Sequence, residues 1–347
     1  MDKIVNVGIA GFGMSAQVFH VPFLTVDPRF KIKKVFERSS EKSKQKIADV
    51  EVVRDFSALL SDDIDLVVIT TPNLTHYPLA KQAIEAGKHV IVEKPVSVTA
   101  NEAAELGRLA ALHGILLSPY QNRRWDSGFD AVKNIIKHNL IGDVVDYQVR
   151  FDRYSPNKNP KRWKETGEKG IGLVYDLGVH LLDHTVDLFG MPQALFADIR
   201  YQQPQALSDD NFQIYLYYPQ LKVELTASKY VREKAPHIAL HGRLGSYIKQ
   251  TMDVQEARLA QGIEPRGNWN LEVETDWGIL NTELNGSHFR GRIESPAMSY
   301  ATYYDNIHAA ITSNTPLIVT IEQATDVMKL LEKCFESAEL RKVIEIE

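Results

Sequence analysis

The stretch Gly8–Ala16, which reads GIAGFGMSA, constrains the fold of this chain more than any other segment. Residues 4–10 form a short and almost wholly apolar run, which is typical of a buried parallel strand. The run leads directly into a G-x-G-x-x-A pattern at 11–16. In such a pattern the first glycine permits a tight turn, the second lets the backbone approach a pyrophosphate, and the small third residue lets the next helix pack closely. The sequence therefore predicts a strand, a glycine turn and a helix start.

The surrounding sequence favours a dinucleotide-binding site over an ordinary strand-to-helix turn. Small and apolar residues follow at helical spacing, at Ala16, Phe19, Phe23 and Leu24, so free backbone N–H groups at the helix start would face an anion. A second strand, expected at 30–38, ends in an acidic residue about 20 residues further along. We expect the whole pattern to bind the cofactor, through Gly11, Phe12, Gly13, Met14, Ser15 and Ala16.

Three residues at the end of the second strand bear on the choice of cofactor. Glu37 can hydrogen-bond a ribose 2′-hydroxyl, which favours NAD, whereas Arg38 and Ser39 can hold a 2′-phosphate, which favours NADP. Solvated strand-end charges are the alternative interpretation. Because one arginine contact with a phosphate outweighs a solvent-screened repulsion from Glu37, we expect NADP, with NAD as the alternative cofactor.

Strands and helices alternate along the rest of the first 120 residues. Strands are expected at 64–71, 88–92 and 115–120, and helices at 75–86 and 100–113. This βαβ alternation predicts a parallel sheet with right-handed crossovers. We therefore assign residues 1–121 to a Rossmann dinucleotide-binding domain.

Polar residues follow two of these strands, at the edge of the sheet where ligands bind in doubly wound folds. The first group is Thr71-Pro72-Asn73, with His76 at the start of the next helix. A turn and a helix cap explain this group nearly as well as cofactor contact does. The second group is Glu93-Lys94-Pro95. Lys94 lies where catalysis occurs in such folds, although a surface lysine is the simpler alternative.

The composition changes from apolar to polar and aromatic at 121–126, QNRRWD. We expect Asn122 and one of the two arginines, Arg123 and Arg124, to reach hydroxyl oxygens of a substrate, and the other arginine to be exposed. Strand-like runs and a few helices follow. The strands are expected at 144–154, 195–202, 212–218, 221–231 and 237–241, and the helices at 129–139 and 174–189.

This second pattern predicts an α+β domain over residues 122–347, with a large, mostly antiparallel open sheet. Residues 212–218 and 221–227 are expected to form a hairpin, and 262–272 a mobile loop. Helices cover only one face of such a sheet, so we expect the other face to join a homodimer or homotetramer.

The stretch 170–190 contains Asp176, His180 and His184 at intervals of four residues, which places them on one side of a helix. Histidine is the side chain best suited to exchange a proton near neutral pH, and a carboxylate one turn away can orient or charge it. A zinc site is the alternative. The glutamate expected between the histidines and a third ligand are both missing from the pattern, so we expect no metal.

Charge and composition exclude several classes of function. The net charge is −5 and no block is rich in lysine or arginine, which argues against a nucleic acid or an anionic membrane as partner. The one cysteine, Cys334, excludes an internal disulfide. No apolar run reaches the roughly 18 residues of a membrane span, and the first run carries the glycine pattern rather than a signal peptide. We expect a cytoplasmic protein that acts on a small molecule.

With the glycine pattern, Glu93-Lys94-Pro95 and the segment 176–183 (DLGVHLLD) in order, the whole chain resembles the Gfo/Idh/MocA family of sugar and polyol dehydrogenases. The segments QNRRWD, FDRYSP and KRW are most similar to its NADP-dependent scyllo-inositol dehydrogenase branch, in which a small polar residue would be expected in place of Glu37. The resemblance implies that Lys94, Asp176 and His180 are catalytic. It further implies nicotinamide-side contacts at Thr71, Pro72, Asn73, His76, Glu93 and Lys94, with Trp163 near the cofactor. On the substrate side it implies Asn122, Arg124, Tyr154, Asp176 and His180.

The expected reaction is hydride transfer between a secondary alcohol carbon of a cyclic polyol or sugar and C4 of a nicotinamide. His180 would exchange the hydroxyl proton, Lys94 would polarise the same oxygen, and Asp176 would orient the substrate or the histidine. Whether Lys94 or His180 moves the proton stays open. The alternatives are a sugar sensor that binds the cofactor without catalysis, and a reductase of a non-sugar substrate such as a dihydrodiol.

Overall fold

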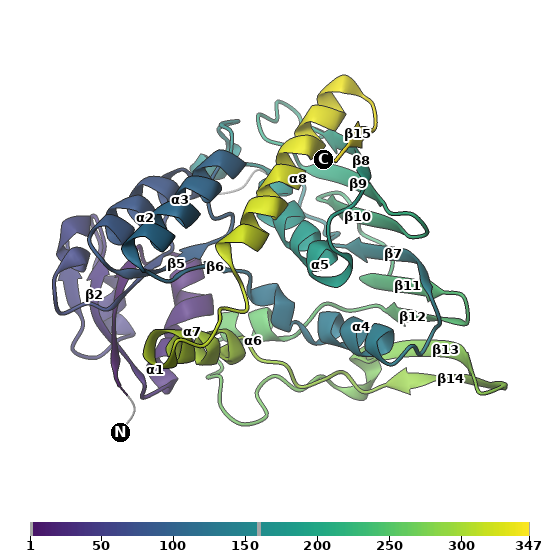
Figure 1. The fold of residues 1–347 in the computed structure, drawn as a ribbon, viewed down its shortest axis with the longest axis horizontal. Coiled ribbons are helices and arrows are strands. Elements are labelled where there is room, and N and C mark those ends of the chain that lie inside the picture. The colour runs from purple at the N-terminus through teal and green to yellow at the C-terminus, as the bar shows by residue number, and fades with distance from the viewer. Residues whose placement is uncertain (1–2, 158–160, 347) are drawn as a thin grey trace. The chain divides into compact units, whose positions relative to one another are not determined.

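The computed structural model describes residues 3–157 and 161–346 and divides into two compact units (Figure 1). The first unit contains Met1–Asn122, Gln255–Asn270 and Ser299–Thr325. The second contains Arg123–Val254, Leu271–Met298 and Asp326–Glu347. The chain thus leaves the first unit after Asn122 and returns to it in two later stretches.

The first unit is built on a six-stranded parallel sheet with the strand order β3-β2-β1-β4-β5-β6. Its strands are β1 (Val5–Ala10), β2 (Phe30–Phe36), β3 (Glu51–Val53), β4 (Leu66–Ile69), β5 (His89–Glu93) and β6 (Leu117–Tyr120). The central strands β1 and β4 are apolar and almost completely buried, as strands covered on both faces must be. The predicted Rossmann-like parallel sheet is confirmed.

Helices connect these strands. A π-helical segment, Ala16–His20, runs into α1 (Val21–Val26), and the later helices of this unit are α2 (His76–Glu85), α3 (Ala100–His113), α6 (Gln255–Ala260) and α7 (Ala301–Ser313). Helix α3 matches its predicted bounds because its ends are encoded locally. The Thr99 hydroxyl and the Glu102 carboxylate form a reciprocal capping box at its start. Helix α8 (Ile321–Leu340) belongs to the first unit up to Thr325 and to the second from Asp326.

The second unit contains a nine-stranded sheet with the order β14-β13-β12-β11-β7-β10-β9-β8-β15. Its strands are β7 (Val144–Arg150), β8 (Ala194–Arg200), β9 (Asn211–Tyr217), β10 (Lys222–Ser228), β11 (Ile238–Gly242), β12 (Gly245–Lys249), β13 (Gly278–Leu284), β14 (Ser287–Ile293) and β15 (Ile344–Glu345). All of its strand pairs are antiparallel except β7 with β10. The predicted mostly antiparallel sheet is confirmed, including the hairpin of β9 and β10, which pairs Tyr217 with Lys222.

Helices cover one face of this sheet (Figure 1). Helix α5 (Val179–Phe189) packs against β10, and Gly128 of α4 (Ser127–Lys137) lies against Lys249 of β12. On β9 the side chains of Phe212, Ile214 and Leu216 are fully buried, whereas the alternating residues are partly or fully exposed.

The opposite face is polar and contains ion pairs between neighbouring strands. Arg150 Nη2 lies 2.6 Å from Glu224 Oε1, and Lys222 Nζ lies 2.9 Å from Asp146 Oδ2. In the described part of this unit, α4 and α5 pack on the other, apolar face. The joining of a second subunit through the polar face stays a prediction.

Residues 262–272 contain no regular helix or strand, but their end is packed. Trp269 and Asn270 are 8% and 7% exposed, and the Trp269 ring lies 6.0 Å from that of Phe23 in an edge contact. The expectation of a mobile loop is therefore wrong for the end of this segment, because the indole fills space in the apolar core of the first unit. Among the helices that the structure describes, none is long and apolar enough to cross a membrane.

Candidate active site

The glycine turn lies at the carboxyl end of β1, between the ends of two neighbouring strands. The Gly11 N–H donates to the carbonyl of Phe36 at 3.0 Å, and Gly11 has a φ of +91°. A Cβ atom on Gly11 would lie 3.2 Å from the Thr71 methyl group, so the turn needs glycine for both conformation and space. A Cβ atom on Gly13 would meet no protein atom within 4 Å. This backbone is open to a close ligand and fits a pyrophosphate.

The remaining residues of the pattern have different surroundings. Phe12 and Ala16 are buried, whereas Met14 is 47% exposed. The Phe12 carbonyl accepts a hydrogen bond from Gln17 Nε2 at 3.0 Å. Ser15 donates its hydroxyl proton to Glu93 Oε1, which connects the glycine turn to the end of β5.

Glu37 is turned into its own loop. Its side chain is buried, and its two carboxylate oxygens accept hydrogen bonds from four donors. These donors are the Ser40 hydroxyl, the Lys42 N–H at 3.0 Å, and the Ser43 N–H and hydroxyl at 2.9 and 2.6 Å. Burial alone would raise the pKa of Glu37, but the hydrogen bonds outweigh it and lower that pKa, so the carboxylate stays ionised.

Arg38 and Ser39 are exposed at the outer side of the same loop. Arg54 holds the two ends of this loop together, because its Nη1 donates to the carbonyl oxygens of Glu37, at 2.8 Å, and of Ser40. The loop is therefore held by hydrogen bonds, and it presents the Arg38 guanidinium and the Ser39 hydroxyl to solvent.

The polar group after β4 is tied together by His76. The His76 ring lies between two carbonyl oxygens, with Nδ1 2.7 Å from Pro95 and Nε2 2.8 Å from Thr71. Burial lowers the pKa of this imidazole. Both ring nitrogens are thus used to join the loop after β4 to the loop after β5. Thr71, Pro72 and Asn73 are partly or fully exposed beside it.

Glu93 and Lys94 follow at the end of β5. Glu93 is 7% exposed, and its Oε2 accepts a hydrogen bond from the Lys94 N–H at 3.1 Å. Burial would raise the pKa of Glu93, but hydrogen bonds from His20 and Ser15 and the charge of Lys94 hold it below its usual value. The Lys94–Pro95 peptide bond is cis. An ionised carboxylate thus lies directly beside Lys94.

In the second unit, Asp176 and His180 lie where a π-helical segment, Val174–Gly178, continues into α5. The residues four apart still fall on nearly the same side of the helix, since the wider π turn changes their angle only modestly. His180 is buried, whereas Asp176 is partly exposed. π-helical segments are frequent at functional sites. In this chain, one such segment follows the glycine turn and the other precedes α5.

Lys164 is a site residue that the sequence did not reveal. Its Nζ lies 3.1 Å from Asp176 Oδ2 and 5.6 Å from the centre of the Trp163 ring. The ion pair is partly exposed, so it contributes little to stability but orients the Asp176 carboxylate. The pairing joins residues of different segments, and no local pattern connects them.

Asp209 holds the start of the Asp176 segment. Its Oδ2 accepts a hydrogen bond from the Val174 N–H at 2.7 Å, and its carbonyl accepts one from the Leu173 N–H at 3.0 Å. Burial raises the pKa of Asp209 to about 6. A Cβ atom on Gly172 would lie 1.8 Å from Asp209 Oδ1, so glycine is required for this approach.

The structure corrects the expectation that one of the two arginines is exposed. Neither is exposed: Arg123 is 7% and Arg124 4% exposed. Arg124 binds Asp183 with two hydrogen bonds, of 2.8 and 2.6 Å, and lies 3.2 Å from Asp187. A guanidinium held by the buried Asp183 and the partly buried Asp187 has a structural role, and the substrate contact expected of Arg124 stays a prediction.

Arg123 pairs with Asp126 at 3.3 Å and stacks over the Phe151 ring at 5.0 Å. Its carbonyl accepts a hydrogen bond from His184 Nε2 at 2.9 Å. The His184 ring is stacked on Phe129, and burial lowers the pKa of His184 well below its usual value. His184 is therefore a structural residue. Asn122 is buried at the end of the first stretch of the first unit.

Tyr154 is 44% exposed, and the guanidinium of Arg232 lies 3.8 Å from the centre of its ring. Its backbone forms an isolated antiparallel bridge with Tyr230. Tyr154 and Trp163 thus keep partly accessible rings in the second unit, which is compatible with the ligand contacts expected of them.

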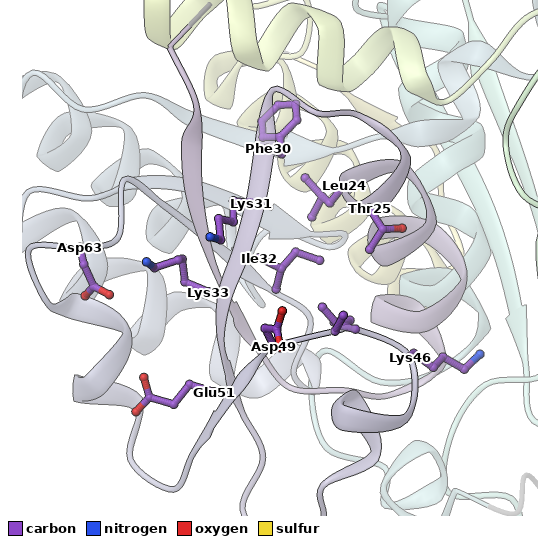
Figure 2. A pocket seen from close by; sticks show the side chains of 12 residues that line it. Leu24, Thr25, Phe30, Lys31, Ile32, Lys33, Lys46, Asp49, Glu51 and Asp63 are labelled. Carbon is purple, nitrogen blue, oxygen red and sulfur yellow. The ribbon is translucent and has the colours of Figure 1, made fainter.

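The hollow shown in Figure 2, of about 580 Å³, lies at the start of β2. Three lysines and three carboxylates line it, namely Lys31, Lys33, Lys46, Asp49, Glu51 and Asp63. This hollow lies at the amino end of β2, whereas the glycine turn follows the carboxyl end of β1. Because β1 and β2 are parallel, the two lie at opposite edges of the sheet. Among the described residues, no group of three or more His, Cys, Asp or Glu side chains is arranged to hold a metal ion.

Comparisons with known proteins match both the N-terminal and the C-terminal part of the chain. The model of an oxidoreductase family with an NAD-binding Rossmann fold matches residues 5–121, and the model of that family's C-terminal alpha/beta domain matches residues 133–346. The scyllo-inositol 2-dehydrogenase (NADP(+)) IolW of Bacillus subtilis is 37% identical over 345 residues, covering 99% of this chain and 96% of that protein.

Two solved structures are similar along the whole chain. An oxidoreductase from Bacteroides fragilis is 40% identical with a TM-score of 0.91, and the alignment covers 99% of this chain and 100% of that one. The oxidoreductase yvaA from Bacillus subtilis is 36% identical with a TM-score of 0.96, covering 100% and 99%.

Proposed function

This chain belongs to the Gfo/Idh/MocA family of oxidoreductases, and we propose that it is an NADP-dependent dehydrogenase of a cyclic polyol, an inositol or its keto form. The substrate class is proposed from the full-length similarity to a relative that carries the name scyllo-inositol 2-dehydrogenase (NADP(+)). The residues of the two units supply the groups that such a reaction needs.

The hydrogen bonds that join Ser15, Glu93 and Lys94 are the observation that carries the proposal. They connect the glycine turn with the lysine at the end of β5 inside one unit. A lysine held in this way lies beside the predicted dinucleotide site, where it can act on a substrate oxygen.

The preference for NADP is supported by the loop after β2. The Glu37 carboxylate is occupied by Ser40, Lys42 and Ser43, so it neither serves a ribose hydroxyl nor faces a 2′-phosphate. Arg38 and Ser39 remain exposed and can form charge-assisted hydrogen bonds with that phosphate.

When bound, the nicotinamide supplies or accepts the hydride at C4 of its ring. His180 takes the hydroxyl proton in oxidation and returns it in reduction, and Lys94 donates a hydrogen bond to the same oxygen. Asp176 accepts a hydrogen bond from the substrate or orients His180, while Lys164 pairs with its carboxylate. The proton is assigned to Lys94 and His180 jointly, because ionisable groups that act on one oxygen titrate together.

We also propose that the polar face of the nine-stranded sheet joins a homodimer or homotetramer. The face carries ion pairs and partly exposed tyrosines, such as Tyr215, on adjacent strands, which suits an interface of moderate polarity. The reducing cytoplasm is the proposed location, since the single cysteine, Cys334, is buried and free.

The test is the absorbance of reduced nicotinamide, recorded with NADP and with NAD against a panel of inositols, aldoses and a dihydrodiol. We expect turnover of at least one inositol and a higher kcat/KM with NADP. Tight binding of NADPH without turnover of any compound in the panel would instead indicate a sensor. Turnover of the dihydrodiol alone would indicate a reductase of non-sugar substrates.

A further inference from the structure

A buried chain of hydrogen bonds runs from helix α7 to the carboxylate beside Lys94. His20 ends the π-helical segment that follows the glycine turn, and its side chain is fully buried. Its Nε2 lies 2.9 Å from Glu93 Oε1, and its Nδ1 lies 2.6 Å from the hydroxyl oxygen of Tyr304. Neither His20 nor Tyr304 is needed to explain cofactor binding or hydride transfer. All of these residues belong to the first unit.

The chemistry of each group sets the direction of these hydrogen bonds. An ionised carboxylate only accepts, so Nε2 of His20 carries a proton toward Glu93. In the neutral imidazole Nδ1 then accepts the Tyr304 proton, and in the imidazolium Nδ1 donates to the Tyr304 oxygen. A hydroxyl can do either. Tyr304 therefore satisfies His20 in both protonation states, and burial keeps Tyr304 itself neutral by raising its pKa well above the usual value.

The His20 ring has little freedom to turn. The Tyr120 ring lies 4.2 Å from it between centres, and Tyr120 donates its own hydroxyl proton to the Phe19 carbonyl at 2.7 Å. The Tyr304 ring meets the His20 ring edge-on at 6.3 Å. The imidazole is thus clamped with one nitrogen toward Glu93 and the other toward α7.

We propose that Tyr304 and His20 are positioning residues of the reaction, which hold the Glu93 carboxylate ionised and oriented beside Lys94. The inference rests on the proposed catalytic role of Lys94. Glu93 Oε1 is shared by His20 and Ser15, and Oε2 accepts from the Lys94 N–H. A loss of the Tyr304 hydroxyl releases His20, which lets the carboxylate turn and moves Lys94 away from its productive place.

Several titratable groups face His20 and Glu93. Glu93 and Lys94 approach from the end of β5, Tyr120 from β6, and Tyr300, Tyr303 and Tyr304 from α7 and its start. His76 faces the Glu93 and Lys94 side from α2. Burial raises the pKa of Tyr120 and of Tyr303, and lowers that of His76, so all three stay neutral near neutral pH.

Tyr304→Phe removes one hydroxyl and keeps the buried ring. We expect kcat to fall about three- to tenfold, the effect of one hydrogen bond, with NADP affinity within twofold of the wild type. The variant frees the His20 ring, and the hydrogen bond from His20 is one of the causes that hold the pKa of Glu93 below its usual value. The acidic limb of the kcat–pH profile should therefore move to higher pH by about 0.5–1 unit.

Tyr303→Phe is the matched control. Tyr303 is the neighbouring residue on α7, is equally buried, and donates its hydroxyl proton to the Ser118 carbonyl at 3.2 Å rather than to His20. A purely structural role for these hydroxyls predicts the same small loss of stability, the same kcat and the same pH profile for both variants. That result would overturn the proposal.

A measurement without substrate separates this inference from the proposed reaction. Trace acetic anhydride labels lysines at rates that report their surroundings, and mass spectrometry identifies Lys94. We expect the pH dependence of Lys94 labelling to change in Tyr304→Phe and in His20→Gln but not in Tyr303→Phe. If that change is seen while no polyol is turned over, the positioning network stands and the proposed reaction fails. If Lys94 labelling is identical in all four proteins, the network has no such role.

Discussion

The carboxylate of Glu37 accepts hydrogen bonds from both the backbone N–H and the hydroxyl of Ser43, at 2.9 and 2.6 Å. These hydrogen bonds give the acidic residue at the end of β2 a structural role in its own loop. In the usual dinucleotide fingerprint such a residue faces the ribose. Here it holds the loop that carries Arg38 and Ser39, so the same loop can recognise a 2′-phosphate in spite of the carboxylate.

Glu37→Gln tests the structural role of this carboxylate. An amide has one acceptor oxygen and brings an NH₂ group against the existing donors, so we expect the free energy of unfolding to fall by about 1.5–3 kcal/mol at neutral pH. The pKa of Glu37 is lowered in the folded state, so its contribution is present above the usual glutamate range and is lost as the pH falls. The two proteins should thus converge in urea unfolding from about pH 5 toward about pH 3.

The control for this change is Glu51→Gln, which alters an exposed glutamate of the neighbouring strand β3. It should leave stability nearly unchanged. Equal stabilities of Glu37→Gln and the wild type at neutral pH would show that the four hydrogen bonds do not hold the loop.

Arg38→Ala tests the proposed 2′-phosphate contact. One charge-assisted contact contributes about 1.5–3 kcal/mol, so the Kd of NADP should rise at least tenfold while that of NAD stays nearly constant. Arg108→Ala removes the same charge from the exposed side of α3 and should change neither constant. An equal loss of affinity for both cofactors would place Arg38 outside the phosphate site.

Two glycines should respond oppositely to substitution. Gly13→Val adds a side chain where no protein atom lies within 4 Å, so stability should change by less than about 1 kcal/mol while NADP binding is abolished. Gly172→Ala places a methyl group against Asp209 at a φ of +116°, and should cost about 3 kcal/mol or more. Urea unfolding and NADP titration of both variants decide this, and wild-type NADP affinity in Gly13→Val would contradict the position of the pyrophosphate.

The sequence predicts best what is encoded within a few residues. Helix α3 has its capping box and the hairpin of β9 and β10 has its alternation, and both are found at the expected places. The hairpin of β13 and β14 carries a comparable signal, since Asn285 and Gly286, an Asn-Gly pair, both have positive φ in its turn.

The candidate site depends on contacts that no local pattern encodes. The direction of the Glu37 side chain is decided by donors in the loop that follows it, and the burial of Arg124 by Asp183 on α5. Lys164 reaches Asp176 from another segment, and Tyr304 reaches His20 from a stretch of chain that returns to the first unit. Residue types therefore identify the chemistry available, whereas tertiary packing decides which groups are engaged internally.

His180→Asn tests the proposed proton exchange. Asparagine keeps a hydrogen-bonding group of similar size but does not titrate, so kcat should fall about 10²-fold or more and lose its pH dependence between about pH 6 and 8. His184→Asn is a useful comparison, because that buried ring is structural and its loss should reduce stability more than it changes the shape of the profile. A pH profile of unchanged shape in His180→Asn would assign the proton to another group.

The most direct test of the account is a single-turnover measurement of NADP reduction by wild-type protein and by Lys94→Ala, each saturated with NADP and mixed with scyllo-inositol. We expect rapid reduction by the wild type, and a rate lower by about 10²-fold or more in Lys94→Ala, with an NADP Kd within twofold of normal. Lys81→Ala, which removes a partly exposed lysine of α2 that pairs with Glu105 in the same unit, should react at the wild-type rate. A wild-type rate of reduction in Lys94→Ala would contradict the central claim that this lysine acts on the substrate.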